Sequence, residues 1–284
     1  MTQTAGAPTP HTTIRPSKGW ATLDLRELWQ FRDLLLALAA RDVKLRYKQT
    51  ALGIAWVIFQ PLLAAGIFTL VFGVIAKLPS GGLPYFVFAY AGQLAWAAFS
   101  NTFSKAGASM VASSHLVSKV YFPRLILPLS TLASTLLDFA VAMVVMIGLM
   151  IAYRIAPSVA ILTLPFWLAI LLLLAIGCGL IAAALMVSYR DVQYILPVLL
   201  PLLMYASPVA YSLKDALARL PGSLRPWLAL NPLSGLLEGF RWSILGTQPP
   251  GALYVLYSVA VAMAICFFGA VVFRRMERRF ADVI

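Results

Sequence analysis

The chain has 284 residues, of which 61% are hydrophobic and only 11% are charged, and its formal net charge at pH 7 is +12. A soluble globular domain carries about 25% charged residues. This composition, with a mean hydropathy of +0.87, therefore excludes a soluble protein and indicates an integral membrane protein. Because Lys and Arg gather on the cytoplasmic flanks of membrane spans, the positive charge does not indicate nucleic acid as a partner.

The N-terminal region divides into a polar tail and a segment of mixed apolar and basic residues. Residues 1–24 are rich in Thr and Pro and lack the apolar stretch of a signal peptide, so we expect a disordered cytoplasmic tail. In residues 25–50, Leu28, Phe31 and Leu35 recur at helical spacing among charged residues. This pattern predicts an amphipathic helix at the membrane interface, followed by a basic juxtamembrane segment. An ordinary packed cytoplasmic helix is the alternative.

Six apolar runs approach or exceed the length of about 20 residues that a helix needs to cross the hydrocarbon core. They are far longer than barrel strands and do not alternate, so they predict an all-α membrane domain over residues 51–273. The second run is the weakest, because Gln93, Asn101 and Lys105 interrupt it. The six predicted transmembrane helices are residues 51–76, 84–110, 125–153, 161–187, 194–213 and 253–273.

The segments that connect the runs predict the topology. Lys and Arg are concentrated before the first run and after the last, which places both termini, including the tail of residues 274–284, in the cytoplasm. Residues 111–124 form a short polar segment on that same side. On the outer side, residues 214–250 carry apolar residues at helical intervals, divided by prolines. This pattern predicts short amphipathic helices that dip into the outer leaflet.

Several kinds of chemistry are missing from the sequence. There is no GxxxxGK[ST] phosphate loop, so we expect the energy source to lie outside this chain. Few ionisable residues lie within the runs and no inverted repeat is evident, which disfavours a secondary transporter. A membrane-embedded transferase is disfavoured because the spans offer almost no catalytic acid or base. Cys178 and Cys266 lie inside apolar runs and predict neither a disulfide framework nor a metal site.

Asp138 requires an explanation, because a charge that faces lipid is costly. Thr131, Ser134 and Asp138 follow the spacing i, i+3, i+7, so they form a polar stripe on the third run that faces protein or a wet cavity. One interpretation is interhelical packing, with Asp138 paired or protonated. The alternative is a direct role in transport. Lys105 and Asn101 on the second run are candidate partners.

Aromatic residues are plentiful on the first and fifth runs. Such residues form the interfacial belt or the core of membrane proteins, and the alternative is that they line a channel and contact sugar rings. Tyr194 and Tyr205 are about three helical turns apart and so share a face. The candidate channel-lining aromatic residues are Trp56, Phe59, Phe68, Phe72, Tyr194 and Tyr205.

An ordered set of short motifs carries a resemblance to a known family. The motifs are RDVKLRYKQT at residues 41–50, LGIAW at 52–56, LVSKVYFPR at 116–124, RDV at 190–192 and NP at 231–232. Together they resemble the permease subunit of type-2 ABC transporters. The similarity is greatest to exporters of lipid-linked O-antigen, teichoic acid and capsule-like polysaccharides. It covers the chain from Leu25 to the C-terminus.

The resemblance implies a homodimer of six-helix subunits that works with two copies of a separate ATPase. The ATPase would bind ATP and Mg²⁺, and no cofactor is implied for this chain. A channel would lie between the subunits, lined largely by the first and fifth spans. Residues 25–38 would be an interface helix, residues 111–124 the coupling helix seated on the ATPase, and residues 214–250 would hold the gating helices. The residues that the resemblance assigns to coupling are Ser114, His115, Leu116, Lys119, Tyr121, Phe122 and Arg124.

The expected function is ATP-driven export of lipid-linked, O-antigen-like polysaccharide across the bacterial inner membrane. Export of a small drug or a lipid by the same family is the alternative. The lipid anchor would carry a pyrophosphate. Arg41, Lys44 and Lys48 recur at helical spacing beside the membrane and are candidate contacts for it. Anchoring on anionic lipid is the other interpretation of these three residues.

Overall fold

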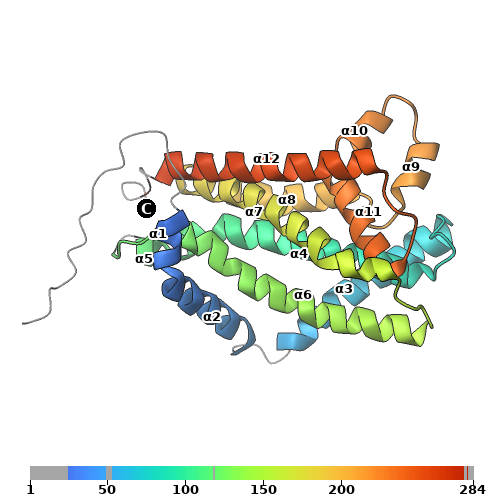
Figure 1. Ribbon diagram of the computed structural model, residues 1–284, viewed down its shortest axis with the longest axis horizontal. Helices are drawn as coiled ribbons and strands as arrows, with labels where there is room; N and C mark the ends of the chain where they lie inside the picture. Colours follow the sequence, from blue (N-terminus) through green and yellow to red (C-terminus); the bar gives the residue numbers. More distant parts are fainter. Residues whose placement is uncertain (1–24, 49–52, 118, 278–279, 281–284) are drawn as a thin grey trace, which may run out of the picture.

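The computed structural model of the chain describes residues 25–48, 53–117, 119–277 and 280, and within these ranges every regular element is a helix. Figure 1 shows the long helices side by side in one elongated bundle. The helices are α1 (Leu25–Gln30), α2 (Arg32–Lys48), α3 (Gly53–Phe68), η1 (Thr69–Ile75), α4 (Tyr85–Ala112), α5 (Ser114–Val117), α6 (Ile126–Ala152), η2 (Val159–Thr163), α7 (Leu164–Ser188), α8 (Val192–Tyr205), α9 (Leu213–Arg219), α10 (Arg225–Ala229), α11 (Pro232–Leu245) and α12 (Ala252–Glu277).

The two ends of the bundle carry different elements. We call the end with α1, α5 and the last turns of α12 the terminal end, and the end with α9, α10 and α11 the distal end (Figure 1). The predicted tail of residues 1–24 lies outside the described residues, as does Ser118. In the predicted tail of residues 274–284, residues 278–279 and 281–284 are also outside the described part.

Four helices in the described part of the chain are long and apolar enough to cross a membrane. They are Ala55–Ile75, Ile126–Ala152, Val159–Ser188 and Ala252–Glu277. α4 has 28 residues but carries several polar groups, and α8 has only 14 residues. The chain is therefore a helical, multi-pass membrane protein, and the count of six spans stays a prediction.

The predicted fifth span, residues 194–213, ends earlier than expected. α8 stops at Tyr205, residues 206–212 form turns, and a new helix begins at Leu213. Pro208 gives the physical reason, because proline has no N–H to donate and disfavours helical geometry at the preceding residue. The helix tolerates Pro197 and Pro201 but does not continue past this third proline.

Three other elements also differ in extent from the prediction. The basic segment before the first span is helical, since α2 continues to Lys48. The first span changes from α-helix to π-helix after Phe68. The predicted coupling helix is short: α4 continues to Ala112, and α5 has only four residues.

α4 lies at the centre of the bundle and packs against α3, α6, α7 and α11, while α7 also packs against α12. Small residues bring α7 and α12 together. A Cβ atom on Gly177 would lie 2.7 Å from the backbone nitrogen of Cys266, and one on Gly269 would lie 2.3 Å from the carbonyl oxygen of Gly177. Close backbone approach through small residues is a usual way for membrane helices to associate.

α11 is a buried part of the bundle, although it belongs to the predicted outer segment. The Asn231 side chain accepts a hydrogen bond from the backbone N–H of Leu233, and Pro232 occupies the first turn. Gly246 ends the helix with φ of 64°, the left-handed conformation that glycine adopts easily. Between these caps, most side chains of α11 are buried against α4, α7 and α12.

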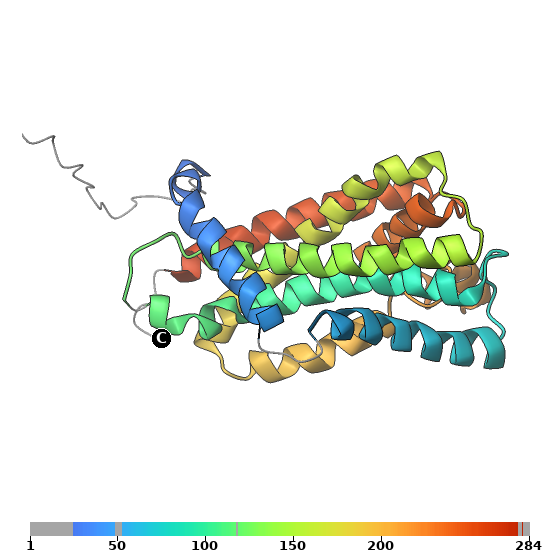
Figure 2. The ribbon, with the colours of Figure 1, turned by 90° about the horizontal axis from the view of Figure 1, so that it is seen from below.

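α2 lies obliquely across the outside of the bundle, as Figure 2 shows. It packs mainly against α6. Its last turns lie close enough to the long helices for the side chain of Arg46 to contact Asp138 on α6. This crossing places a basic side chain from the N-terminal region among the long helices.

Candidate functional site

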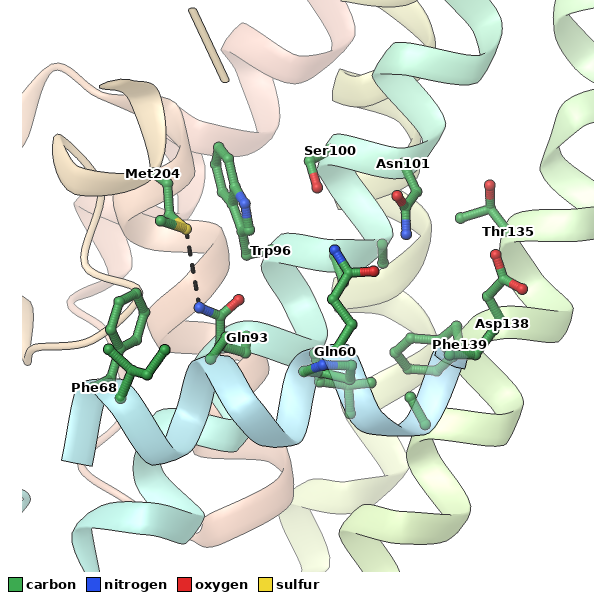
Figure 3. A pocket seen from close by; sticks show the side chains of 18 of the residues that line it. Gln60, Phe68, Gln93, Trp96, Ser100, Asn101, Thr135, Asp138, Phe139 and Met204 are labelled. Atoms are coloured by element: carbon green, nitrogen blue, oxygen red, sulfur yellow. Dashed lines mark hydrogen bonds between the residues drawn. The ribbon is translucent and has the colours of Figure 1, made fainter. Parts of the chain in front are cut away.

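A cavity of about 360 Å³ lies between α3, α4, α6 and α8, with Arg46 of α2 at its edge (Figure 3). Its lining mixes apolar side chains with amides, hydroxyls and aromatic rings. The polar and charged lining residues are Arg46, Gln60, Gln93, Ser100, Asn101, Thr135 and Asp138. The aromatic lining residues are Phe68, Trp96, Phe139 and Tyr205.

The cavity contains the amide side chains of Gln60, Gln93 and Asn101. Gln93 is only 6% exposed, and its amide nitrogen lies 3.9 Å from the sulfur of Met204, a weak acceptor. A buried amide without a strong partner costs free energy. Gln60, from α3, and Asn101, from α4, point toward the same space (Figure 3). The cavity therefore suits water or a ligand that carries hydroxyl groups.

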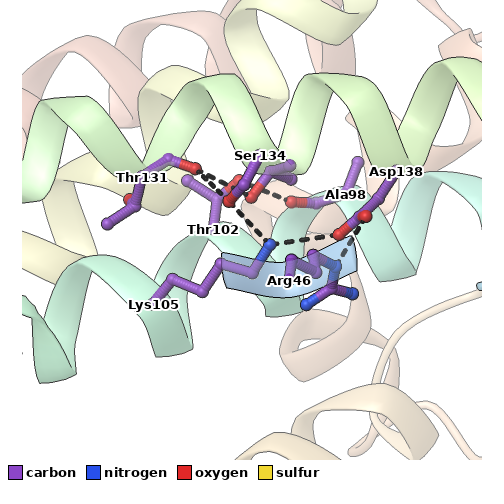
Figure 4. A network of polar contacts seen from close by, with 8 residues as sticks. Arg46, Ala98, Thr102, Lys105, Thr131, Ser134 and Asp138 are labelled. Atoms are coloured by element: carbon purple, nitrogen blue, oxygen red, sulfur yellow. Dashed lines mark hydrogen bonds and ion pairs between the residues drawn. The ribbon is translucent and has the colours of Figure 1, made fainter. Parts of the chain in front are cut away.

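Three charged side chains from three helices meet at one side of the cavity (Figure 4). The Arg46 Nε donates to Asp138 Oδ1 at 2.7 Å. The Lys105 Nζ donates to Asp138 Oδ2 at 3.1 Å and to Ser134 Oγ at 3.0 Å. We call Arg46, Lys105 and Asp138 the triad. It joins α2, α4 and α6.

The triad bears on the first interpretation of Asp138, and a direct role in transport stays a prediction. The carboxylate is paired, and Lys105, named as a candidate from sequence, is one of its partners. Asn101, the other candidate, lines the same cavity. Arg46 was missed as a partner, because it lies outside the predicted spans and its basic neighbours suggested simple surface anchoring. The hydroxyls of the polar stripe bond mostly within α6, as when Ser134 Oγ donates to the carbonyl of Thr131 at 3.0 Å.

The predicted aromatic residues fall into two groups. Trp56, Phe59, Tyr194 and Tyr205 are 56%, 51%, 71% and 60% exposed in the single chain, so they lie at the surface of α3 and α8, and Tyr205 also borders the cavity. Phe68 is buried and lines the cavity. Phe72, in η1, packs edge-on against Phe68 with ring centroids 5.6 Å apart. A role of these residues in a channel stays a prediction.

The residues predicted to couple to an ATPase lie at the terminal end of the bundle. Ser114, His115 and Leu116 are on α5, and the Lys119 and Tyr121 side chains that follow are exposed.

Phe122 is buried in a hydrophobic cluster with Phe273 and Phe280. The backbone N–H of Arg124 donates to Glu277 Oε1 at 3.2 Å, and its guanidinium donates to the Glu277 carbonyl. The segment is therefore tied to the end of α12, while the side chains of Lys119 and Tyr121 are exposed to solvent.

Two of the three residues predicted to contact pyrophosphate, Arg41 and Lys44, have described side chains on α2. Arg41 pairs with Asp42 at 2.9 Å, and the side chain of Lys44 is exposed. The Lys48 side chain lies outside the described residues. Neither Arg41 nor Lys44 lines the cavity, whereas Arg46 from the same helix does.

A second ionic cluster lies near the distal end and was not foreseen from the sequence. Arg241 of α11 has no exposed surface. Its Nη2 donates to the carbonyls of Pro208 and Val209, both at 2.8 Å, and its Nη1 lies 3.2 Å from Glu238 Oε1. The guanidinium also lies 4.0 Å from the centroid of the Phe88 ring. The cluster fixes the turn after α8 onto α4 and α11.

Comparison with known proteins agrees with this architecture. Residues 33–245 match the family described as ABC-2 type transporter. The chain is 30% identical over 260 residues to the O-antigen export system permease protein RfbA of Myxococcus xanthus, an alignment that covers 92% of this chain and 98% of that protein.

Two further relatives align over most of the chain. The O-antigen export system permease protein RfbA of Klebsiella pneumoniae is 25% identical over 254 residues, covering 89% of this chain and 95% of that protein. The polysialic acid transport protein KpsM of Escherichia coli is 24% identical over 246 residues, covering 85% and 92%. The resemblance seen in the motifs is thereby confirmed, and the chain belongs to the ABC-2 type transporter family.

Proposed function

We propose that this chain is the permease subunit of an ATP-driven exporter that moves lipid-linked, O-antigen-like polysaccharide across the bacterial inner membrane. The observation that carries the proposal is the cavity of amides, hydroxyls and aromatic rings among apolar helices. Amides and hydroxyls can exchange hydrogen bonds with sugar hydroxyls, and aromatic rings can stack on sugar faces. Relatives that align along nearly their full length and are named for O-antigen export support the same conclusion.

The working unit in this proposal is a homodimer with two copies of a separate ATPase, which binds ATP and Mg²⁺. Both termini lie in the cytoplasm, so the terminal end of the bundle faces the ATPase. The exposed side chains of Lys119 and Tyr121 at that end support a docking role for the segment. The outer faces of α3 and α8 line the channel between the subunits. Their exposed aromatic residues, including Trp56 and Tyr194, support this arrangement.

The mechanism follows from the rigidity of the bundle. ATP binding draws the two ATPase subunits together and moves the segment around α5. That segment is tied to α12 through Arg124 and Glu277. Its displacement therefore moves the long helices together as a rigid body. Aromatic rings along the channel let a hydrated polymer slide without strong fixed hydrogen bonds.

The test is to delete the gene and locate the lipid-linked surface polysaccharide. We expect intact polymer to accumulate on the cytoplasmic side and to disappear from the cell surface, and a plasmid copy to restore it. Wild-type surface glycan in the deletion strain would contradict the proposal. Export of a small drug or a lipid would then be the function that remains for this family member.

A further inference from the structure

The triad carries more positive than negative charge. Arg46 and Lys105 each approach a different oxygen of the same carboxylate, at 2.7 Å and 3.1 Å. The three side chains together have a formal charge of +1, since two cations share one anion. Asp42 of α2 also lies within electrostatic range of Lys105, but it is itself paired with Arg41 at 2.9 Å, so these two further charges cancel. An excess positive charge among membrane helices is expensive and usually marks a functional site.

The accessible part of the triad is cationic. The side chain of Arg46 is 36% exposed and that of Lys105 is 22% exposed, whereas that of Asp138 is 6% exposed. Of the two cations, Arg46 lines the cavity and is the first that an approaching group meets, while Lys105 holds the Asp138 carboxylate from the side of α4. Arg and Lys side chains bind carboxylate and phosphate oxygens through short, charge-assisted hydrogen bonds.

Neutral hydrogen-bonding groups continue from the triad into the cavity. Arg46 and Asp138 line the same cavity as Gln60, Ser100 and Asn101, and Figure 3 shows the amides of Gln60 and Asn101 near Asp138. The cations suit an oxyanion, and the amides and hydroxyl suit the hydroxyl groups of a sugar. The arrangement thus fits one ligand class, a glycan that carries an acidic oxygen group.

We propose that Arg46 and Lys105 form an oxyanion site, where a phosphate or carboxylate joined to a glycan displaces Asp138. In the empty state Asp138 acts as the internal counter-ion. A singly charged ligand brings the total charge of the site to zero, so neither state isolates a large charge among the helices. The proposal rests on the proposed function for the source of the glycan. Two sources share this chemistry: the phosphate of a lipid anchor and an acidic sugar of the polymer.

The test measures ligand binding to the purified full-length permease in lipid nanodiscs. The probes are farnesyl pyrophosphate, which represents a lipid anchor, and a sialic acid trimer, which represents an acidic polymer; maltotriose is the neutral control. Arg46→Gln should weaken binding of the acidic probe by about tenfold or more, because a charge-assisted hydrogen bond is lost. Arg32→Gln is the matched control, since Arg32 lies on the same helix and is exposed.

Asp138→Asn gives the decisive readout. Removal of the competing carboxylate should tighten binding of the acidic probe by about tenfold, because the probe no longer competes with Asp138 for the same charge-assisted hydrogen bonds. A purely structural ion pair predicts no gain in affinity. Thermal unfolding of each variant checks folding. The double variant Arg46→Gln/Asp138→Asn removes one charge of each sign and should fold while binding weakly.

Each outcome bears on the proposal. Farnesyl pyrophosphate binding that depends on Arg46 supports an anchor phosphate, and trimer binding that depends on Arg46 supports an acidic polymer. If the wild-type protein binds neither probe, if Arg46→Gln and Arg32→Gln bind equally, or if Asp138→Asn shows no gain, the oxyanion site is overturned. A deletion strain with normal surface glycan, beside Arg46-dependent binding, would reject glycan export but keep the oxyanion site.

Discussion

Arg241 near the distal end and Arg46 at the end of α2 are both cations held among apolar helices, but their surroundings differ. Arg241 has no exposed surface and is enclosed by carbonyl oxygens, Glu238 and the Phe88 ring. Arg46 keeps 36% of its side-chain surface exposed, lines a cavity and shares its carboxylate with Lys105. One arginine is closed off by the protein, and the other remains open to a ligand.

This difference separates a structural charge from a binding charge. Around Arg241, removal of any partner leaves a buried group unsatisfied, and a ligand has no route of approach. Around Arg46, a partner can be exchanged, because the cavity that Arg46 and Asp138 line offers space and further hydrogen-bonding groups. Burial and pairing are found at both places, so the adjoining cavity is the property that distinguishes them.

The largest effect in this comparison is expected for Arg241→Met. Loss of the guanidinium leaves two carbonyl groups without this donor and Glu238 without its cation, with only the Leu213 N–H as a donor. Breaking a buried ion pair costs about 3–5 kcal/mol. The measurement is thermal or denaturant unfolding of the detergent-solubilised protein. Arg219→Met is the control, because Arg219 is exposed on α9. Equal stability of the two variants would show that Arg241 is not a structural clamp.

A smaller effect is expected for Gly92→Ala, which tests how tightly the turn after α8 is held on α4. A Cβ atom at this position would lie 2.0 Å from the carbonyl oxygen of Val209 and 2.8 Å from Arg241 Nη2. Overpacking of this kind costs about 1–3 kcal/mol. Gly148→Ala in α6 is the matched control, since a Cβ atom there meets nothing within 4 Å. If both substitutions leave the unfolding temperature unchanged, the close contact is not important for stability.

The smallest effect on stability is expected for Asp138→Asn. Asparagine keeps the shape and can still accept hydrogen bonds, and Arg46 keeps access to the cavity. The expected loss is about 1 kcal/mol, the difference between a hydrogen bond to a charged group and one between neutral groups. Unfolding is measured beside Arg241→Met under the same conditions. An equal loss in both variants would remove the distinction between the closed and the open cluster.

Several features could be predicted from the sequence because they depend on local composition. Apolar runs require a membrane whatever their packing, so the class of protein and most helices follow from hydropathy. The Asn231-Pro232 pair and Gly246 bound α11 through contacts within a few residues. The sequence also predicts that Asp138 is either paired or protonated if it serves in helix packing, since an isolated carboxylate in a span is too costly.

Other features depend on residues that the fold brings together from distant parts of the chain. Arg46 and Asp138 are 92 residues apart, and nothing local distinguishes Arg46 from Arg41 or Lys44 on the same helix. The burial of Arg241 depends on the turn after α8, where a proline ends a helix that hydropathy alone would extend. Hydropathy and helix capping depend on residues that are close in the chain, so they can be recognised in the sequence. The pairing of charges across helices is decided by the packing angles of whole helices, and therefore by the tertiary structure.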